Sequence, residues 1–399
     1  MTILFADGFD LANISGWFTK YTYQEAAGTL IVASQIPGAG SGPGIGSALF
    51  LGQSGSGASN FLTQVPNQTT LSVRFAFQPR NNSLVQTWTT NMFLMIGSGG
   101  IGGPTVASLQ MRSDGFIEIR SGGGSNNMGV VLDIVGSDGA AATVPFAVGV
   151  WGDLELYWTP SSYSLYWNGV LLKTRTSVAW GFANVNTVNF RIQVGSGTGY
   201  AIDDYTISDA ILGPQRITSA YPIAETVPGW VPNTGTPVSA VSDHTGLYIP
   251  DGDTTVIQPP AAILDMFQVQ TVPCYGLIRA VAVNASMRPD SSAVTDNRVS
   301  LWFRGAGIPQ QIGASRFLVY GLVRTYTPQL SGYTVYQQIA QNSPDTGSAF
   351  TAGEVSLSDW GLQADAGTAQ RCTQFYVEVV TTLDQSIPYQ CGGGGAYSL

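Results

Sequence analysis

Glycine and proline divide this chain into short segments, and their frequent occurrence constrains its fold more than any other feature. The 399 residues include 49 Gly and 21 Pro, and the segments between them are rich in β-branched and aromatic residues. Almost no window has apolar residues at positions i, i+3, i+4 and i+7, which is the pattern of an amphipathic helix. We therefore expect an all-β fold.

Several segments alternate apolar and polar residues, as a strand with one buried face requires. Residues 71–77 (LSVRFAF) do so, and residues 153–158 (DLELYW) repeat the pattern. In the second segment Leu154, Leu156 and Trp158 would point to one side. Asp153, Glu155 and Tyr157 would then point to the other, which we expect to be an exposed strand face.

Two dipeptides predict hairpins. Asn168-Gly169 separates residues 162–167 from residues 170–174 and supplies the two positive φ angles of a type I′ turn. Together with 153–158 these segments predict a three-stranded meander. Asp114-Gly115 separates residues 106–111 from 116–120, and we expect a second hairpin of the same kind there.

Length and proline spacing predict two domains. A chain of 42.1 kDa exceeds what one core usually fills. Strands recur up to Ile207, and then prolines stand at 214, 222, 228, 232 and 237. Because proline is excluded from central strands, we expect an extended linker there. The predicted domains are 1–213 and 214–399, each a β-sandwich.

The second half contains further expected strands and one short helix. The strands are predicted at residues 277–287, 298–304, 317–326 and 375–382. Thr351 and Glu354 have the spacing of a capping box, which predicts a single helical turn after Thr351.

Composition argues against two classes of partner. The net charge is -9, and the basic residues are 14 Arg with only Lys20 and Lys173, so no basic stripe exists to neutralise the phosphates of a nucleic acid. No apolar stretch approaches the 18 or so residues that cross a bilayer. Asp7 and Asp10 interrupt the start, so we expect synthesis in the cytoplasm without a signal peptide.

The three cysteines, Cys274, Cys372 and Cys391, are widely spaced and form no CxxC pair. This favours buried thiols over a disulfide framework or a zinc site. A disulfide between subunits through Cys391 is the alternative.

The order of motifs in the first half resembles a known family. Residues 151–158 (WGDLELYW), 163–169 (YSLYWNG) and 201–205 (AIDDY) follow one another as in the concanavalin A-like (laminin-G-like) jelly roll. The opening residues 7–10 (DGFD) with Trp17 resemble the first strand of such domains. The resemblance implies that this first strand pairs beside the last one, which carries residues 202–207.

The second half resembles a β-sandwich found at the C-terminal end of virion proteins of tailed bacteriophages. The matching pieces are residues 230–235 (WVPNTG), 251–255 (DGDTT), 280–283 (AVAV), 345–347 (DTG), 350–351 and 360–361. Phe350 stands where such proteins often have Trp, and the usual basic residue is missing after Ala364, so the subfamily stays open. The resemblance implies a structural protein of a phage particle.

This resemblance sets our expectations for location and partners. The protein would be made in the host cytoplasm and built into a virion head, neck, tail or fibre. Its partners would be other virion proteins and copies of itself, as a homo-oligomer such as a trimer. With only two lysines to protect exposed strand edges, neighbouring subunits or glycine-rich loops would cover them, and residues 389–399 would order against a neighbour.

Catalytic groups are scarce in the sequence. The only imidazole, His244, lies in a turn-like SDHTG segment, and no GxSxG elbow accompanies it. Some jelly-roll relatives are glycosidases with carboxylates alternating on one strand. Asp153 and Glu155 begin that pattern, but Tyr157 ends it. We therefore expect no catalytic residues and no enzyme, with a polysaccharide hydrolase as a minor alternative.

Metal and cofactor sites were sought in the same way. Asp203-Asp204 and Asp251-Gly252-Asp253 are the calcium candidates. Adjacent acids on a strand point to opposite faces, so the first pair would need a bulge, and the second lacks further acidic ligands. The glycine-rich residues 38–46, 97–103 and 122–124 lack the Lys-Ser or Lys-Thr of a phosphate loop. We expect no metal and no cofactor.

Aromatic side chains offer one alternative function. Aromatic faces bind the apolar side of sugar rings, and Trp88 and Trp180 lie outside regular strand patterns, whereas Trp158 and Trp167 lie in the apolar phase. The alternative to an assembly role is therefore a module that binds a glycan on the host surface.

Overall fold

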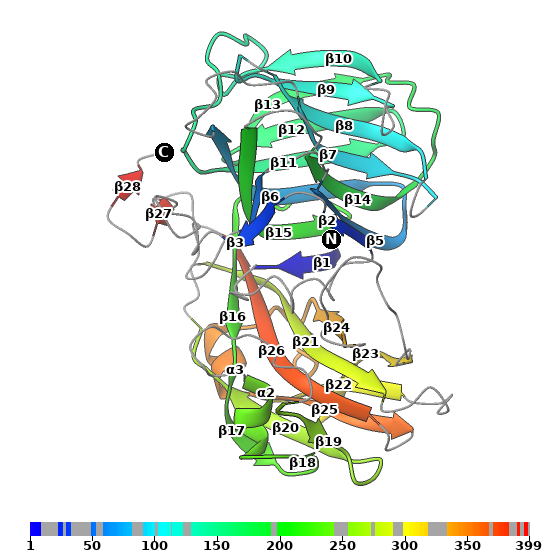
Figure 1. The fold of residues 1–399 in the computed structure, drawn as a ribbon, viewed down its shortest axis with the longest axis vertical. Helices are drawn as coiled ribbons and strands as arrows, with labels where there is room; N and C mark the ends of the chain where they lie inside the picture. The colour runs from blue at the N-terminus through cyan, green and yellow to red at the C-terminus, as the bar shows by residue number, and fades with distance from the viewer. Residues whose placement is uncertain are drawn as a thin grey trace. The chain divides into compact units, whose positions relative to one another are not determined.

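The structure is a computed structural model of the whole chain. It describes residues 1–8, 23–26, 29–32, 49–52, 59–81, 91–99, 103–112, 114–122, 129–192, 198–242, 254–272, 276–289, 298–317, 333–366, 370–382, 389–391 and 395–397. Strands dominate these residues, and the expected all-β class is confirmed (Figure 1).

The chain divides into two compact units. Unit 1 comprises Met1–Phe9, Tyr21–Gln215 and Gln385–Leu399, and unit 2 comprises Asp10–Lys20 and Arg216–Asp384. Each is a pair of antiparallel sheets.

In unit 1, the first sheet, called sheet A, has the strand order β13-β12-β11-β6-β15-β4-β3, with β1 paired to β15. Its strands are β1 (Ile3–Asp7), β3 (Thr29–Val32), β4 (Leu49–Gly52), β6 (Leu71–Asn81), β11 (Gly152–Thr159), β12 (Ser162–Trp167), β13 (Val170–Thr176) and β15 (Thr198–Ser208). The pairing of β1 with β15 confirms the expectation for the first and last strands.

The second sheet of unit 1, called sheet B, has the order β10-β9-β8-β7-β14-β5-β2. Its strands are β2 (Tyr23–Ala26), β5 (Ser59–Gln68), β7 (Asn91–Gly97), β8 (Thr105–Met111), β9 (Ile117–Ser121), β10 (Val130–Val135) and β14 (Val185–Ile192). Figure 1 shows sheets A and B as two layers of one sandwich.

Aromatic rings from both sheets fill the space between them. Phe75 of β6 meets Phe190 of β14 edge to face at 4.9 Å between ring centroids, and Phe77 stacks on Phe93 at 4.9 Å. The predicted alternation of β11 is confirmed, because Leu154, Leu156 and Trp158 are buried on the core side. The opposite residues of each strand therefore form the outer faces of the sandwich.

Both predicted hairpins are present, but their turns differ. Asn168 and Gly169 have φ angles of 51° and 77° between β12 and β13, as a type I′ turn requires. Between β8 and β9 only Gly115, with φ of 85°, has a positive φ among the described loop residues. There the N–H of Arg112 donates to the carbonyl of Phe116 over 2.8 Å, so the loop is longer than a two-residue turn.

Unit 2 contains two further sheets. Sheet C has the order β18-β19-β26-β21-β24, with β16 paired to β26, and sheet D has the order β17-β20-β25-β22-β23. The strands of sheet C are β16 (Gln215–Ala220), β18 (Val231–Pro232), β19 (Ile257–Gln258), β21 (Ile278–Pro289), β24 (Thr334–Ala340) and β26 (Gln370–Thr382). Those of sheet D are β17 (Pro222–Val227), β20 (Leu264–Val269), β22 (Arg298–Arg304), β23 (Gln310–Phe317) and β25 (Asp359–Ala366).

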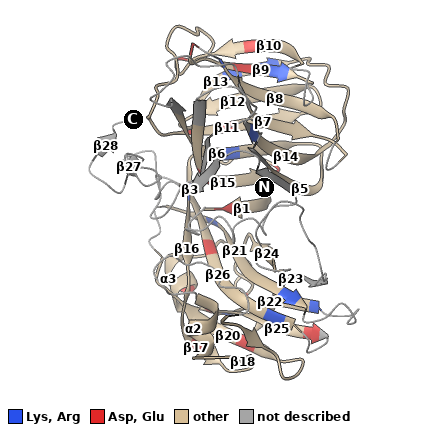
Figure 2. Ribbon diagram, in the orientation of Figure 1, with Lys and Arg blue, Asp and Glu red and all other residues tan. Residues whose placement is uncertain are grey.

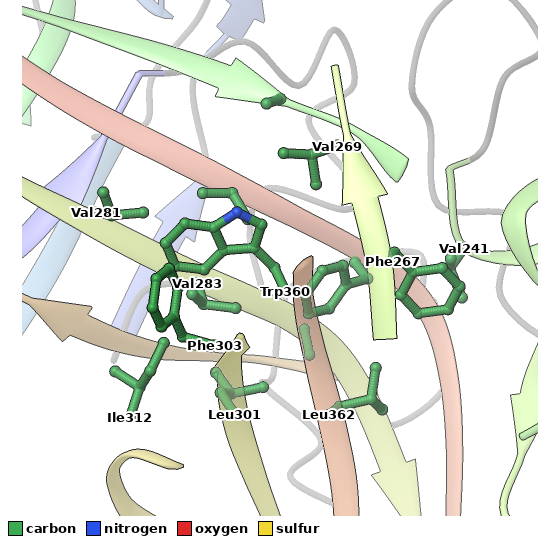
Figure 3. Packing of buried hydrophobic residues seen from close by; sticks show 14 of the residues in the cluster. Val241, Phe267, Val269, Val281, Val283, Leu301, Phe303, Ile312, Trp360 and Leu362 are labelled. Atoms are coloured by element: carbon green, nitrogen blue, oxygen red, sulfur yellow. The ribbon is translucent and has the colours of Figure 1, made fainter. Parts of the chain in front are cut away.

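The core of unit 2 lies between sheets C and D. Figure 3 shows the indole of Trp360 among side chains from both sheets, including Val283 and Phe303. The rings of Phe303 and Trp360 are 4.9 Å apart and meet edge to face. Because Trp360 is completely buried, its truncation to Ala would cost about 3–5 kcal/mol.

The proline-rich segment, expected to be an extended linker, forms strands of unit 2. Residues 214–237 contain β16, β17 and β18. Pro222 begins β17, which is an edge strand of sheet D, and Pro232 ends β18, which is an edge strand of sheet C. Proline is tolerated at these places because an edge strand leaves some N–H groups without a ladder partner.

Two described helices accompany the sheets. The predicted capping box is confirmed: α3 (Ala352–Leu357) follows Thr351, whose side chain accepts from the N–H of Glu354. The sequence did not lead us to α2 (Pro237–Ser242), although Pro237 occupies a first helical position, where proline is favoured. No described helix is both long and apolar enough to cross a membrane.

Two expectations concern segments of which the structure describes only a few residues. The strand expected at 317–326 lies almost entirely outside the described residues. In the C-terminal tail, which we expected to order against a neighbouring subunit, β27 (Tyr389–Cys391) pairs with β28 (Gly395–Tyr397) of the same chain.

Candidate functional site

Several residues singled out in the sequence lie outside the described residues. They are Lys20, the glycine-rich residues 38–46, Trp88, His244, Asp251, Asp253 and Cys274. Of the remaining candidates, the acids lie on described strands and Trp180 lies between β13 and β14.

The structure brings three of the predicted acids to one face of sheet A. Asp153 of β11 and Asp203 of β15 each lie opposite Ala76 of the intervening strand β6. Paired residues share a face of a sheet, so both carboxylates are on the outer face. Glu155 lies two residues further along β11 and therefore shares this face.

Arg74 is the cation at the centre of this face. It lies opposite Glu155 on one side and Thr206 on the other, and its guanidinium forms an ion pair with Asp153. Its two terminal nitrogens donate to the carbonyls of Asp204 and Gln215, both over 2.6 Å. Arg74 is completely buried, so this ion pair has no access to solvent.

Glu155 binds the segment that follows the last strand of unit 1. Its carboxylate accepts from the N–H of Leu212 over 2.7 Å and from that of Gly213 over 3.0 Å. It also accepts from the hydroxyl of Ser72 over 2.5 Å. These contacts hold residues 212–215 against the outer face.

This arrangement corrects the expectation for Asp153 and Glu155. We expected an exposed strand face, but their exposed fractions are 2% and 1%, because the ion pair with Arg74 and the segment at 212–215 cover it. Neither carboxylate can reach a polysaccharide in this conformation. The hydrolase alternative that rested on these two residues loses its support.

A bulge separates Asp203 from Asp204. The pairing of β15 with β6 shifts register between Asp203 and Thr206, and Asp204 has a φ of 50°, which Asp tolerates better than most residues. The bulge that a calcium site would need is therefore present. Among the described residues, however, no three His, Cys, Asp or Glu side chains gather closely enough to hold a metal ion.

Two candidates, Trp180 and Cys372, are buried. Trp180 is 6% exposed, and its ring lies 6.0 Å from that of Tyr163, so it packs inside unit 1 and offers no face to a sugar. Cys372 is a buried thiol in β26.

The outer face of sheet B has a different character. A cross-strand row runs through Arg120 (β9), Ser108 (β8), Met95 (β7), Asn189 (β14) and Leu62 (β5), each lying opposite the next. Asn189 follows Val188 and precedes Phe190, which both face the core, so this row is on the outer side. It contains both hydrogen-bonding and apolar side chains, and Asn189 lies between the apolar Met95 and Leu62.

Several polar atoms on this face are buried without a hydrogen bond. Among them are the hydroxyl oxygen of Ser108, the Oδ1 of Asn189 and the Nε of Arg191, and no described residue pairs with these three. Leaving such a group unsatisfied costs about 1–3 kcal/mol, so buried polar atoms in proteins usually find protein, water or a ligand. Asn189 and Arg191 are half-buried residues, whereas Ser108 is completely buried.

Charged side chains at one end of the face pair with one another. Glu118 accepts from Arg120, and Arg112 approaches it at 3.4 Å. Hydrogen bonding from Arg112 to Asp114 also lowers the pKa of the Asp114 carboxyl. Figure 2 shows the charged residues of β9 and β10, which are neighbouring strands at one edge of sheet B. Arg191 is not part of these ion pairs.

The sequence did not lead us to these residues. Asn189 and Arg191 occupy the polar phase of residues 185–192, just as Asp153 and Glu155 occupy that of β11. Alternation identifies the outer face of a strand but not what covers it. The sequence therefore predicts the face on which Asn189 and Arg191 lie, but not that they are half-buried.

Comparison with known proteins yields only structural likenesses. No protein-family model matches the chain, and no curated protein matches it in sequence. Among solved structures, it is similar to the cellulose induced protein Cip1, with a TM-score of 0.40 and 18% identity over 52% of this chain and 99% of that chain. A Corynebacterium alginate lyase has a TM-score of 0.29 and 10% identity over 40% of this chain and 76% of that chain. A Trypanosoma rangeli sialidase has a TM-score of 0.29 and 13% identity over 42% of this chain and 26% of that chain.

The TM-scores of these likenesses are 0.40 or lower, so the β-sandwich form of this chain rests on its own sheets. One expectation is corrected. We expected that the protein is not an enzyme, but the similar structures include an alginate lyase and a sialidase, which are enzymes. None of the three proteins is described as part of a phage particle.

Proposed function

We propose that unit 1 binds a carbohydrate on the outer face of sheet B. The observation that carries this proposal is the pair of half-buried polar residues, Asn189 and Arg191, each with an atom that no described residue satisfies. Sugar hydroxyls both donate and accept hydrogen bonds, so one saccharide unit can serve an amide oxygen and a guanidinium N–H together.

Apolar side chains surround Asn189 on this face. Met95 and Leu62 flank it on the neighbouring strands, and both are only 6% exposed. A saccharide would therefore contact this face through the half-buried Asn189 and Arg191. Binding sites commonly combine an apolar lining with a few placed polar groups.

A glycan array probed with the full-length protein tests this proposal. We expect binding that falls about 5- to 150-fold in Asn189→Ala and in Arg191→Ala, since each loses a hydrogen bond of about 1–3 kcal/mol. Arg304→Ala in unit 2 is the matched control and should bind as the wild type does. Bound polymers should also be analysed for shortened products, which would reveal cleavage. Absence of signal above background on neutral and anionic glycans would reject the proposal.

A second proposal concerns the place of the protein. The resemblance of residues 230–361 to the C-terminal sandwich of tailed-phage proteins supports a component of a phage particle that assembles with itself and with other virion proteins. Mass spectrometry of purified particles tests membership, and detection in infected-cell lysate alone would reject it. Light scattering of the full chain, with and without residues 389–399, tests self-assembly.

A further inference from the structure

Arg191 is a cation of sheet B without a counter-ion among the described residues. On the same outer face, Arg112 pairs with Asp114 and Glu118. Arg120 also pairs with Glu118. Arg191 takes part in none of these ion pairs, and its Nε is buried without a hydrogen bond. Because arginine stays protonated in proteins, the described residues leave the positive charge of Arg191 uncompensated.

The partial burial of Arg191 favours binding of an anion. The side chain is half-buried, so it has lost part of its hydration, and a cation taken out of water is disfavoured unless it is paired. At its Nε the protein excludes water but supplies no acceptor. An anion that reaches the exposed part of the side chain would form charge-assisted hydrogen bonds, which are about twice as strong as neutral ones.

The backbone holds Arg191 at a fixed place on the sheet. Its carbonyl oxygen accepts from the hydroxyl of Tyr200, a residue of sheet A, over 3.2 Å. The pairing of β14 with β7 ends one residue before it, where Phe190 lies opposite Leu94. There β7 contains a bulge, since its register with β8 shifts between Met92 and Leu94. Bulges are common next to binding sites, because they redirect side chains and interrupt the ladder.

Asn189 supplies the second group of the site. It lies on the same face of β14, two residues before Arg191, and such residues are about 7 Å apart along a strand. This separation is comparable with the span of one sugar ring and its substituents. The Oδ1 of Asn189 accepts hydrogen bonds, whereas a guanidinium only donates them. A ligand that serves both must present a donor and, one ring away, an acceptor, and a negative acceptor suits Arg191 best.

We infer that Arg191 binds the carboxylate of a uronate residue in a glycan, while Asn189 accepts a hydrogen bond from a hydroxyl of the same residue. The inference rests on the proposed function and narrows its ligand to an acidic saccharide. Glu118, an acid on the same face, does not oppose it. Glu118 is paired with Arg120, and its strand β9 is three strands from β14. That separation of about 14 Å exceeds the screening length of about 8 Å.

Paired oligosaccharides test this inference with the full-length protein. Oligomers of galacturonate, of glucuronate and of mannuronate are each offered as the free acid and as the methyl ester, and titration calorimetry measures Kd. The ester keeps the sugar and its hydroxyls but carries no charge. At least one free acid should therefore bind about 10- to 150-fold more tightly than its ester. Added salt should reduce this ratio, because it screens the ionic contact.

Three variants assign the effect to single side chains. Arg191→Gln should lower the affinity for the free acid to that for the ester. Arg191→Lys keeps the charge but loses the planar pair of donors, so its ratio should lie between those of the wild type and Arg191→Gln. Asn189→Ala should weaken acid and ester by the same factor and leave the ratio unchanged. Arg175→Gln, which removes the same charge from sheet A, is the matched control and should bind as the wild type does.

Three results would overturn the inference. Equal affinity for acid and ester, with weaker binding in Asn189→Ala, would reject the uronate but leave the proposed glycan site in place. An acid preference that survives in Arg191→Gln would assign the carboxylate to another residue. Absence of binding to every free acid would also reject the inference, and the neutral glycans of the array would then decide on the site itself. The acid-to-ester ratio of the wild type decides even if a variant does not fold.

Discussion

The two outer faces of unit 1 carry polar residues in the same alternating phase but use them differently. On sheet A, Arg74, Asp153 and Glu155 are buried and bound to one another or to the chain that covers them. On sheet B, Asn189 and Arg191 are half-buried and each leaves an atom without a partner among the described residues.

This difference separates the structural role of the sheet A residues from the binding role that we propose for those of sheet B. A buried ion pair with all its contacts inside the protein holds its own chain in place, and removing one partner leaves the other uncompensated. A buried polar atom without a partner does not stabilise the fold, because it loses its hydrogen bonds to water and gains none in return. Substitutions on the two faces should therefore have opposite profiles: large losses of stability on sheet A, and losses of binding on sheet B.

The largest effect is expected for Arg74→Met. This change removes the buried cation and leaves the carboxylate of Asp153 and two carbonyls without their donor, so unfolding should become easier by about 3–5 kcal/mol. Urea denaturation followed by tryptophan fluorescence measures the loss. Arg191→Met on sheet B is the matched substitution and should cost less than about 1 kcal/mol. Similar losses in both variants would remove the distinction between the faces.

An intermediate effect is expected for Glu155→Gln. The amide keeps the size of the side chain but loses the charge that strengthens the hydrogen bonds from Leu212 and Gly213, so we expect a loss of about 1–3 kcal/mol. Hydrogen exchange should also show faster opening of residues 209–215 than in the wild type. Unchanged protection of that segment would mean that Glu155 does not hold it.

A smaller effect is expected for a substitution of Asp133, which joins β10 at the edge of sheet B to β12 and β13 of sheet A. Asp133 of β10 pairs with Lys173 of β13 over 2.9 Å, with Arg175 over 3.2 Å, and accepts from Tyr163 of β12. Burial raises the pKa of Asp133, but these three hydrogen bonds outweigh it and hold the pKa below its usual value. Its contribution is therefore present above about pH 4 and is lost as the pH falls through the lowered value.

Asp133→Asn should cost about 1 kcal/mol at neutral pH, because the ion pairs are partly exposed. The gap between variant and wild type should close below pH 4. Thermal unfolding at pH 7 and at pH 3 measures both values, and a constant gap would contradict the assignment.

The smallest effect is expected for Ser108→Ala. Its hydroxyl is buried on sheet B without a partner, so its removal should change the unfolding free energy by less than about 0.5 kcal/mol or should stabilise the protein. Because the residue is completely buried, glycan binding should stay unchanged. A tenfold loss of binding would place Ser108 in contact with the ligand and enlarge the proposed site.

Local chemistry made much of the fold predictable. The alternation of residues 153–158 gave the correct core side for Leu154, Leu156 and Trp158, and Asn168-Gly169 gave the correct turn. In each case the signal lies within a few residues, where strand geometry and φ preferences decide. The capping box at Thr351 succeeded for the same reason.

Long-range pairing explains what could not be predicted. Asp153 lies 79 residues from Arg74 in the sequence, and no local pattern says that the two are neighbours. The segment after the jelly roll was expected to cross a surface as a linker, because its prolines suggested no pairing. That these prolines lie in edge strands depends on which strands pair beside them. The coverage of Asn189 and Glu155 likewise depends on residues far away in the sequence.

The contacts of Arg74 also set an order of events during synthesis. Its carbonyl acceptors are 130 and 141 residues further along the chain. At a ribosomal rate of about 5–20 residues per second, they emerge on the order of ten seconds after β6. Until then Arg74 has to remain hydrated, and the strand that carries it cannot complete its outer face. A nascent chain that stops before residue 204 should therefore remain open to chaperones and proteases, whereas one that has passed residue 215 can close.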